Sequence, residues 1–427
     1  MATPDTPWKP WEKVSFRFFF LFIVITSYLC WDATIYILHG VLYGTPFDLG
    51  SMYKPIAPIL FWFDKHIFHI GFNPQRQDGY PGDNHFGVVF YFTVFFVSAI
   101  AAIIWSYPDR KRTNYNKLSY WFRLYLRYAL GIVMFGYGID KLIPVQMPHP
   151  TIMTLLTPYG YLNRFSVLWN SMGVAPGYMI FTGAAEVLAA LLLFSRRTAV
   201  AGYMLTAAVM ANVVALNFFY NIQVKLFSSQ LLFYSLFLLA PYLKNIFRFF
   251  FYNDATPFTQ RRYAFYTGWK KYALIAVLIV VPLTVLTINT TGVARRYVGN
   301  QADRGKEKAW DVVTFIAKDT LPPLTTDTLR WKRLLLFNQW HADRAVVMNM
   351  KDEPDWYQYE IDTLKKTLTL HDTPDKSTWK VLNYTYPSKD KMQLSGKWKG
   401  HDIQVQLKVF PIDSMWLNKE KIKVIRD

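Results

Sequence analysis

Three long apolar segments follow one another between residues 177 and 240, and they restrict the possible folds of this chain more than any other feature. They are separated only by Ser195-Arg196-Arg197 and by a short turn over 219–225. About 20 apolar residues suffice for a helix to cross the hydrocarbon core of a bilayer. Because the bilayer offers backbone polar groups no water, only helices and closed barrels span it. We therefore predict a membrane bundle of helices.

Four further segments of similar character bring the predicted number of membrane helices to about seven. The predicted helices cover 14–38, 86–106, 122–143, 178–194, 199–219, 226–249 and 272–288. Two connecting regions, 39–85 and 144–176, are aromatic and too long for simple turns. The apolar stretch 56–70 within the first is too short to span, so we interpret it as a re-entrant or interfacial helix. We expect both regions to cap the outer side of the bundle.

The lysines and arginines of this half are distributed unevenly over its loops. The amino terminus and the loops after the second, fourth and sixth segments carry most of them. Cytoplasmic loops are enriched in Lys and Arg. We therefore predict a cytoplasmic amino terminus and, after an odd number of crossings, a carboxy-terminal domain on the outer side.

The character of the chain changes near residue 292, and we divide it into a transmembrane domain, 1–292, and an extracytoplasmic β-domain, 293–427. The charged stretch 294–308 is interpreted as a linker. Beyond it, short alternating runs recur every 8–12 residues or so, which is typical of an antiparallel barrel or sandwich. These runs are 330–340, 343–351, 355–362, 365–372, 378–387, 390–398, 402–410 and 421–425. The predicted fold class is a multi-pass α-helical membrane bundle followed by an all-β antiparallel domain.

Composition excludes several classes of function. The net charge is +18, but the positive loops account for much of it. The sequence contains no basic run interleaved with aromatic residues, so we do not expect nucleic-acid binding. Cys30 is the only cysteine, so the chain can form neither an internal disulfide nor a CxxC relay. His66 and His69 form a pair without cysteine or carboxylate ligands, and we predict no metal site. No histidines occur at membrane depth on facing helices, so we expect no bound haem.

Glu186 is the most constraining polar residue within the apolar segments. It shares one helix face with Gly183 and Ala190, whose small size allows tight packing and turns the carboxylate inward. An ionisable residue at membrane depth marks a candidate functional site. One interpretation is a structural hydrogen bond from a protonated Glu186. The other is a proton-carrying or ligand-binding carboxylate, paired with Lys141 or Lys225.

The segment 122–143 carries a second set of candidate residues. Arg127, Gly131, Gly138 and Lys141 share one face of the predicted helix. We interpret Arg127 as reaching the inner headgroups, and Lys141 as reaching either the outer headgroups or Glu186.

Three further polar residues lie in the apolar segments. Asn212 and Asn217 are five residues apart, about 140° around the helix, so we expect at least one to form a packing hydrogen bond. Asp32 lies toward the outer end of the first segment, where it is either an interfacial anchor or a partner of Lys141 or Lys225.

Three stretches in this order resemble the DoxX family of small membrane proteins. They read RYALGIVMFGYGIDKL, then FTGAAEVLAALLLFSRRTAVAGYMLTAAVMANVVALNF, then VKLFSSQLLFYSLFLLAP, and they cover about residues 120–245. That family resembles a four-helix bundle whose first helix ends in G-x-x-K and whose second contains G-x-x-E. Gly138 with Lys141, and Gly183 with Glu186, match those positions, and Lys225 begins the matching third helix. The flanking helices and the lipocalin-like β-domain resemble a longer bacterial DoxX-type architecture.

The resemblance implies a quinone-linked redox role in a bacterial inner membrane, with the β-domain in the periplasm. We expect a quinone or another lipophilic small molecule in a pocket that opens outward. Glu186 and Lys141 would contact its polar head, supported by Asn212, Lys225, Asp32 and Asn217, and the protein would act as, or with, an oxidoreductase. The alternative is a non-enzymatic scaffold or assembly partner whose β-domain binds lipid or protein. A proton-coupled transporter ranks lowest, because inverted repeats and broken helices are not evident.

Overall fold

The computed structural model describes residues 7–29, 56–71, 82–254, 268–304, 307–339, 342–372, 379–415 and 417. The chain divides into two compact units. The helical unit comprises Met1–Pro144 and Gly177–Ala294, and the barrel unit comprises Val145–Pro176 and Arg295–Asp427. Asp32 and the run 421–425 lie outside the described residues.

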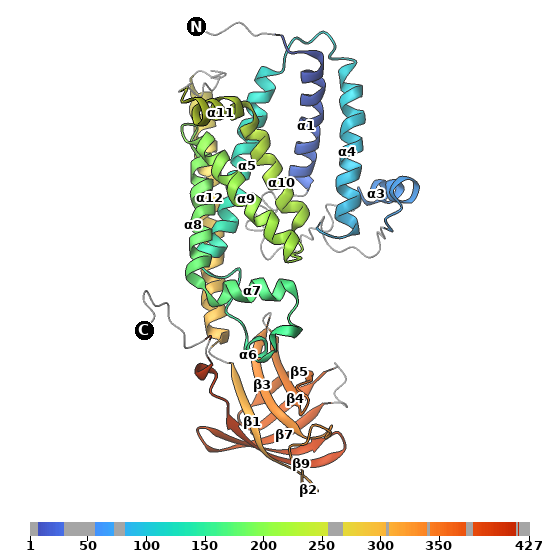
Figure 1. The fold of residues 1–427 in the computed structure, drawn as a ribbon, viewed down its shortest axis with the longest axis vertical. Coiled ribbons are helices and arrows are strands. Elements are labelled where there is room, and N and C mark those ends of the chain that lie inside the picture. Colours follow the sequence, from blue (N-terminus) through green and yellow to red (C-terminus); the bar gives the residue numbers. More distant parts are fainter. Residues whose placement is uncertain are drawn as a thin grey trace. The chain divides into compact units, whose positions relative to one another are not determined.

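The helical unit is built from long helices and a few short ones (Figure 1). They are α1 (Pro10–Leu29), α3 (Ala57–Phe63) with the π-helix η2 (Asp64–Phe68), α4 (His85–Ser106), α5 (Asn116–Leu142), α8 (Pro176–Phe194), α9 (Ala199–Phe219), α10 (Lys225–Leu239), η4 (Ala240–Tyr242), α11 (Leu243–Tyr252) and α12 (Trp269–Arg304).

Five stretches of helix are long and apolar enough to cross a membrane, and they indicate a membrane protein. These are His85–Ser106, Pro176–Phe194, Ala199–Phe219, Lys225–Tyr252 and Trp269–Ala302. The other two predicted segments also form helices, α1 and α5, but both carry several charged residues. Length and composition in the described residues therefore support five spans, and the predicted count of seven is not confirmed.

Two sequence interpretations need correction in this unit. The predicted segment 226–249 is interrupted, because α10 ends at Leu239 and a 3₁₀ turn containing Pro241 leads into the separate helix α11. Proline lacks the N–H that would continue an α-helix. The stretch interpreted as a charged linker is instead largely the end of α12, which continues to Arg304. Its Ala, Arg and Gln residues are good helix formers, and charge alone does not end a helix.

The core of the helical unit surrounds α5. The main apolar cluster combines Leu126, Leu130 and Val133 of α5 with Ile23, Leu193, Tyr203, Met210, Leu231, Tyr234 and Leu238 from α1, α8, α9 and α10. A smaller cluster joins Leu60 of α3 to Val89 and Phe90 of α4, so the region 56–68 is a short helix packed on its neighbour. The bundle thus positions the inner face of α5 against several helices at once.

The barrel unit contains a closed antiparallel barrel, which confirms the barrel form of the predicted β-domain. Its strands are β1 (Lys308–Ala317), β2 (Asp319–Thr320), β3 (Trp331–Gln339), β4 (Ala342–Asn349), β5 (Pro354–Asp362), β6 (Thr367–His371), β7 (Lys380–Ser388), β8 (Lys391–Trp398) and β9 (His401–Val409). β1 and β3 to β9 pair in sequence order, and β1 also pairs with β9, which closes eight strands. The short β2 adds to the edge of β1.

The interior of the barrel is filled by aromatic side chains. The Trp331 and Trp398 ring centroids are 4.7 Å apart, and Tyr357 lies 5.6 Å from Trp398. Phe315 lies 5.9 Å from Trp331 and completes the cluster. All four side chains are buried, so they form a packed core of the kind expected in an eight-stranded barrel.

Strands β1, β3 and β4 are buried on both faces. Leu334 and Leu336 point into the barrel core, whereas Leu335 and Phe337 belong to a second cluster outside it. That outer cluster includes Ile152 of the short helix α6 (Ile152–Leu156). Partly buried residues that precede β1 and follow β9 in the sequence pack against it. The region 144–176, expected to cap the bundle, therefore contributes to the barrel unit; it also holds η3 (Tyr159–Tyr161) and α7 (Arg164–Val174).

Candidate functional site

Helices α5 and α8 approach each other closely at two glycines. A Cβ atom on Gly138 would lie 2.8 Å from the backbone nitrogen of Val187 and 3.0 Å from the Cβ of Glu186. A Cβ atom on Gly183 would lie 2.6 Å from the backbone nitrogen of Leu142. All three distances are shorter than van der Waals contact, so glycine is required at each position.

A buried ion pair lies directly beside these glycines. The Nζ of Lys141 donates hydrogen bonds to Oε1 and to Oε2 of Glu186, each at 2.7 Å. Lys141 is 8% exposed and Glu186 is 2% exposed. Of the two cations predicted for Glu186, Lys141 is therefore its partner. The close approach of the helices brings the two side chains into contact, because each follows its glycine by three residues.

The pair offers a specific set of chemical groups in an apolar environment. The ammonium group of Lys141 is a donor, and the carboxylate of Glu186 can accept a hydrogen bond or carry a proton. The Lys141 Nζ also lies 5.8 Å from the ring centroid of Tyr137.

Lys225 has a different partner from the predicted one. Asp83 accepts hydrogen bonds from the backbone nitrogens of Lys225 at 2.8 Å and Leu226 at 2.9 Å, and the Lys225 Nζ lies 3.4 Å from the same carboxylate. A carboxylate at a helix N-terminus satisfies free N–H groups and the helix dipole. The contact between Lys225 and Asp83 thus fixes the start of α10. The sequence did not predict a role for Asp83, because this residue lies in an irregular loop beside Asn84, the N-cap of α4.

The two asparagines of α9 have separate environments. Asn217 is buried and its Nδ2 donates to the Oγ of Ser228 on α10 at 2.9 Å, which confirms that one of the pair is a packing hydrogen bond. Asn212 lies on an exposed part of α9. Among the predicted ligand-binding residues that the structure describes, only Lys141 and Glu186 hydrogen-bond to each other.

A buried polar network that the sequence analysis missed joins α1, α4 and α10. The Tyr91 hydroxyl donates to Oε1 of Gln230, and the Nε2 of Gln230 donates to the Tyr234 hydroxyl at 2.5 Å. The Tyr234 hydroxyl and the Thr26 Oγ1 are 2.7 Å apart. These residues are uncharged and lie in apolar segments, so hydropathy does not distinguish them. The amide of Gln230 is the one sequence signal for this network.

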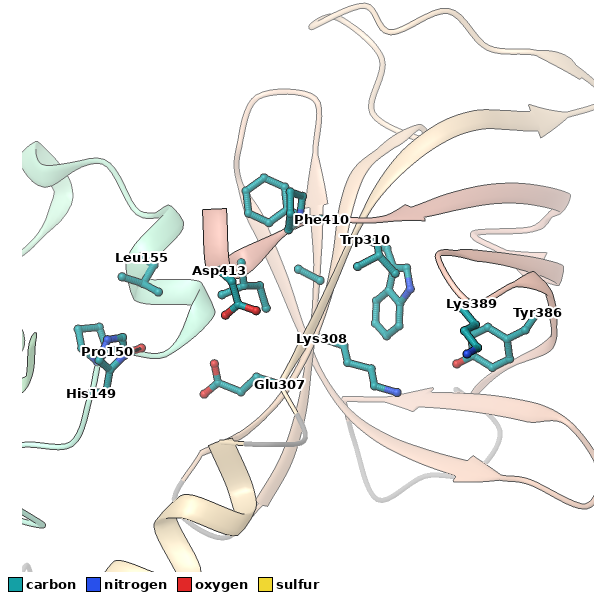
Figure 2. Close-up of a pocket in the computed structure, with 14 residues that line it drawn as sticks. His149, Pro150, Leu155, Glu307, Lys308, Trp310, Tyr386, Lys389, Phe410 and Asp413 are labelled. Atoms are coloured by element: carbon teal, nitrogen blue, oxygen red, sulfur yellow. Dashed lines mark hydrogen bonds between the residues drawn. The ribbon is translucent and has the colours of Figure 1, made fainter. Parts of the chain in front are cut away.

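The barrel unit contains a pocket of about 460 Å³. It lies at the start of β1 and the end of β9, and His149 and Leu155 from the α6 region contribute to its wall. Glu307 and Lys308 extend to opposite sides of β1, with Lys389 and Tyr386 on the Lys308 side (Figure 2). Burial raises the pKa of Tyr386 above its ordinary value. The pocket therefore presents both signs of charge beside an un-ionised phenol.

Metal binding finds no support in the part of the chain that the structure describes, where no group of three or more His, Cys, Asp or Glu residues gathers. The prediction that the chain has no metal site concerns the whole chain and stays a prediction.

Comparisons with known proteins identify one relative and little else. No family model matches the chain, and no solved structure matches it. A stretch of 118 residues is 31% identical to "Uncharacterized protein YwoB" of Bacillus subtilis (strain 168), and it covers 28% of this chain and 72% of YwoB. By this identity over most of the relative's length, the chain belongs to the same family as YwoB.

Proposed function

We propose that this chain is a DoxX-like, multi-pass protein of the bacterial inner membrane that binds a quinone or another lipophilic small molecule beside Lys141 and Glu186. The observation that carries the proposal is the buried, doubly hydrogen-bonded ion pair between α5 and α8. Ionisable residues inside membrane bundles are costly and mark ligand or proton pathways by default.

The proposed topology has seven crossings, with α1 and α5 added to the five apolar spans. The amino terminus is then cytoplasmic and the barrel unit periplasmic. The uneven distribution of lysines and arginines over the loops supports this orientation.

In the proposed site, the polar head of the ligand inserts at the ion pair and its apolar body lies between helices. The Lys141 ammonium donates a hydrogen bond to a quinone carbonyl, and Glu186 exchanges a proton with the hydroxyl of the reduced form. The two electrons of that reduction come from a partner oxidoreductase or from its reduced substrate. The quinol gains two protons in this reduction: Glu186 supplies one, and the other comes from solvent. The protein thereby holds the quinone head and provides one of its two protons.

The proposal is tested by native mass spectrometry of the full-length protein in lipid nanodiscs with added menaquinone or ubiquinone. We expect one bound quinone in the wild type and at least a tenfold weaker signal in the double variant Lys141→Met/Glu186→Gln. The double variant is used because it leaves no unpaired charge in the bundle. Ser195→Ala is the control, because this side chain lies in the exposed turn between α8 and α9. A wild type that binds neither quinone, or a double variant that binds as well as wild type, contradicts the proposal.

The second candidate is a scaffold or assembly partner whose barrel unit binds lipid or protein, and the 460 Å³ pocket favours it. In cells lacking the gene, we would compare complementation by Lys308→Ala/Lys389→Ala and by Lys141→Met/Glu186→Gln. Loss of complementation only in the pocket variant supports the scaffold. Loss only in the ion-pair variant supports the membrane site.

A further inference from the structure

Two arginines lie one turn apart in the first half of α5, and they take no part in the proposed quinone site. Arg127 is 7% exposed, and Arg123 is partly buried. Arginine side chains near a membrane surface ordinarily extend to the lipid headgroups. Arg127 instead is buried among the helices of the bundle. That it lies at the level of the inner headgroups stays a prediction.

The hydrogen-bonding capacity of both guanidinium groups is only partly used. The Arg127 guanidinium lies near the Tyr203 hydroxyl, and its Nε has no hydrogen-bond partner. The Nη1 and Nη2 of Arg123 lie 3.4 Å from the backbone oxygens of Leu238 and Phe237, at the long limit for a hydrogen bond. Strong donors therefore remain available in a largely desolvated region.

The two positive charges also lack an acidic partner. Within the described residues, no carboxylate forms an ion pair with Arg123 or Arg127, whereas Lys141 pairs with Glu186 and Lys225 with Asp83. Buried charges are costly unless they are paired. Two neighbouring guanidinium groups repel each other as well, so a bound anion would stabilise this part of the bundle.

Two tyrosines, Tyr203 and Tyr242, lie beside the two arginines and differ in their exposure. Tyr203 is 4% exposed and lies beside Arg127, whereas Tyr242 in η4 is partly exposed. The Tyr203 and Tyr242 ring centroids are 6.2 Å apart. Arg127 and Tyr203 are thus buried, and Arg123 and Tyr242 are partly exposed beside them.

We propose that Arg123, Arg127, Tyr203 and Tyr242 form a binding site for a phosphoryl group, carried by an anionic phospholipid or by a soluble phosphate. Guanidinium groups bind phosphate oxygens in bidentate fashion, and tyrosine hydroxyls add neutral donors. In the proposed topology this end of α5 faces the cytoplasmic leaflet, which is rich in anionic lipids.

The test uses full-length protein and native mass spectrometry of lipids retained from mixed phosphatidylglycerol and phosphatidylcholine nanodiscs. We expect the wild type to retain phosphatidylglycerol at least tenfold more than phosphatidylcholine. Arg123→Gln/Arg127→Gln should lose this preference. The control Arg110→Gln/Arg197→Gln removes the same charge from two exposed arginines and should keep it.

A second arm separates lipid from soluble phosphate. In nanodiscs of phosphatidylcholine alone, a rise in Tm with millimolar inorganic phosphate, absent from Arg123→Gln/Arg127→Gln, indicates a soluble ligand. If the glutamine variant does not fold, Arg123→Lys/Arg127→Lys keeps the charge but loses the planar fork, and its lipid preference should fall severalfold. A wild type with neither lipid preference nor phosphate response overturns the site, as does equal loss in the control.

Discussion

Glu186 lies in one of the most apolar parts of the chain, and burial of its charge alone would be prohibitive. The doubly hydrogen-bonded Lys141 ammonium removes most of that cost, and neither charge is left facing lipid. Breaking such a pair from one side is more damaging than removing both charges, because a lone buried charge remains. The pair is therefore a coupled unit and not two independent residues.

A double-mutant cycle should reveal this coupling. Lys141→Met and Glu186→Gln are each expected to lower the free energy of unfolding, by about 3–5 kcal/mol for an unpaired buried charge and less where the remaining group becomes neutral. The double variant should lose less than the sum of the single losses. Denaturant unfolding in detergent micelles measures all four proteins. Additive single losses would show that the two residues do not interact energetically.

Tyr357 predicts a pH dependence of the barrel unit. Burial, aided by Asp355 and Asp372, raises its pKa to about 12. Between about pH 10 and pH 12 the unfolded state therefore loses this proton while the folded state keeps it, so stability falls as pH rises. The contribution is about 3 kcal/mol at most.

The matched variant for this effect is Tyr357→Phe, which packs similarly against Trp398 but cannot titrate. Urea unfolding at pH 9 and pH 11, followed by tryptophan fluorescence, should show a smaller loss in Tyr357→Phe than in wild type. Equal losses in the two proteins would mean that Tyr357 is not the titrating group.

The contact of α5 with α8 depends on backbone proximity. A Cβ atom at Gly183 would meet the backbone oxygen of Gly138 at 2.7 Å as well as the nitrogen of Leu142. Backbone atoms within two helices cannot yield separately, so the helices must move apart as rigid bodies. The same movement would lengthen the hydrogen bonds from Lys141 to Glu186.

Gly183→Ala is therefore expected to be destabilising by about 1–3 kcal/mol, the usual range for overpacking. Gly177→Ala is the control in the same helix, since a Cβ there meets nothing within 4 Å. Thermal unfolding of both variants provides the comparison. A Gly183→Ala protein as stable as Gly177→Ala would mean that the two helices can separate freely.

Sequence prediction succeeded for most strands of the barrel. The short runs of the β-domain predicted β3 to β9, although β3 and β4 are buried on both faces. Strand β1 was missed, because Ala309 and Trp310 are both buried, on opposite faces, so its sequence does not alternate.

At the candidate site, the helical spacing made the Lys141–Glu186 pair predictable, because both follow a glycine on a packing face. The Asp83–Lys225 contact was not predictable, because Asp83 belongs to a loop without periodicity and lies far from Lys225 in the sequence. The cluster of Arg123 and Arg127 with two tyrosines was not predictable either, because the tyrosines come from α9 and η4, far from the arginines in the sequence.

At the scale of the whole molecule, the proposed topology makes a labelling prediction. In a Cys30→Ser background, Leu364→Cys adds a thiol at a position that is 94% exposed in the barrel unit. Ser195→Cys adds one in the exposed turn between α8 and α9. A membrane-impermeant maleimide should label Leu364→Cys in intact spheroplasts and Ser195→Cys only after permeabilisation. The reverse pattern would invert the orientation.

The outer face of β1, β3 and β4 is covered by α6, which precedes these strands in the chain by some 150 residues. During synthesis, α6 is therefore made first, then α8 to α12, and only then the strands on which α6 packs. In the proposed orientation α6 waits outside the membrane, with Ile152 and its apolar neighbours uncovered. The packing of α6 on the barrel can therefore form only after all the intervening helices have been synthesised.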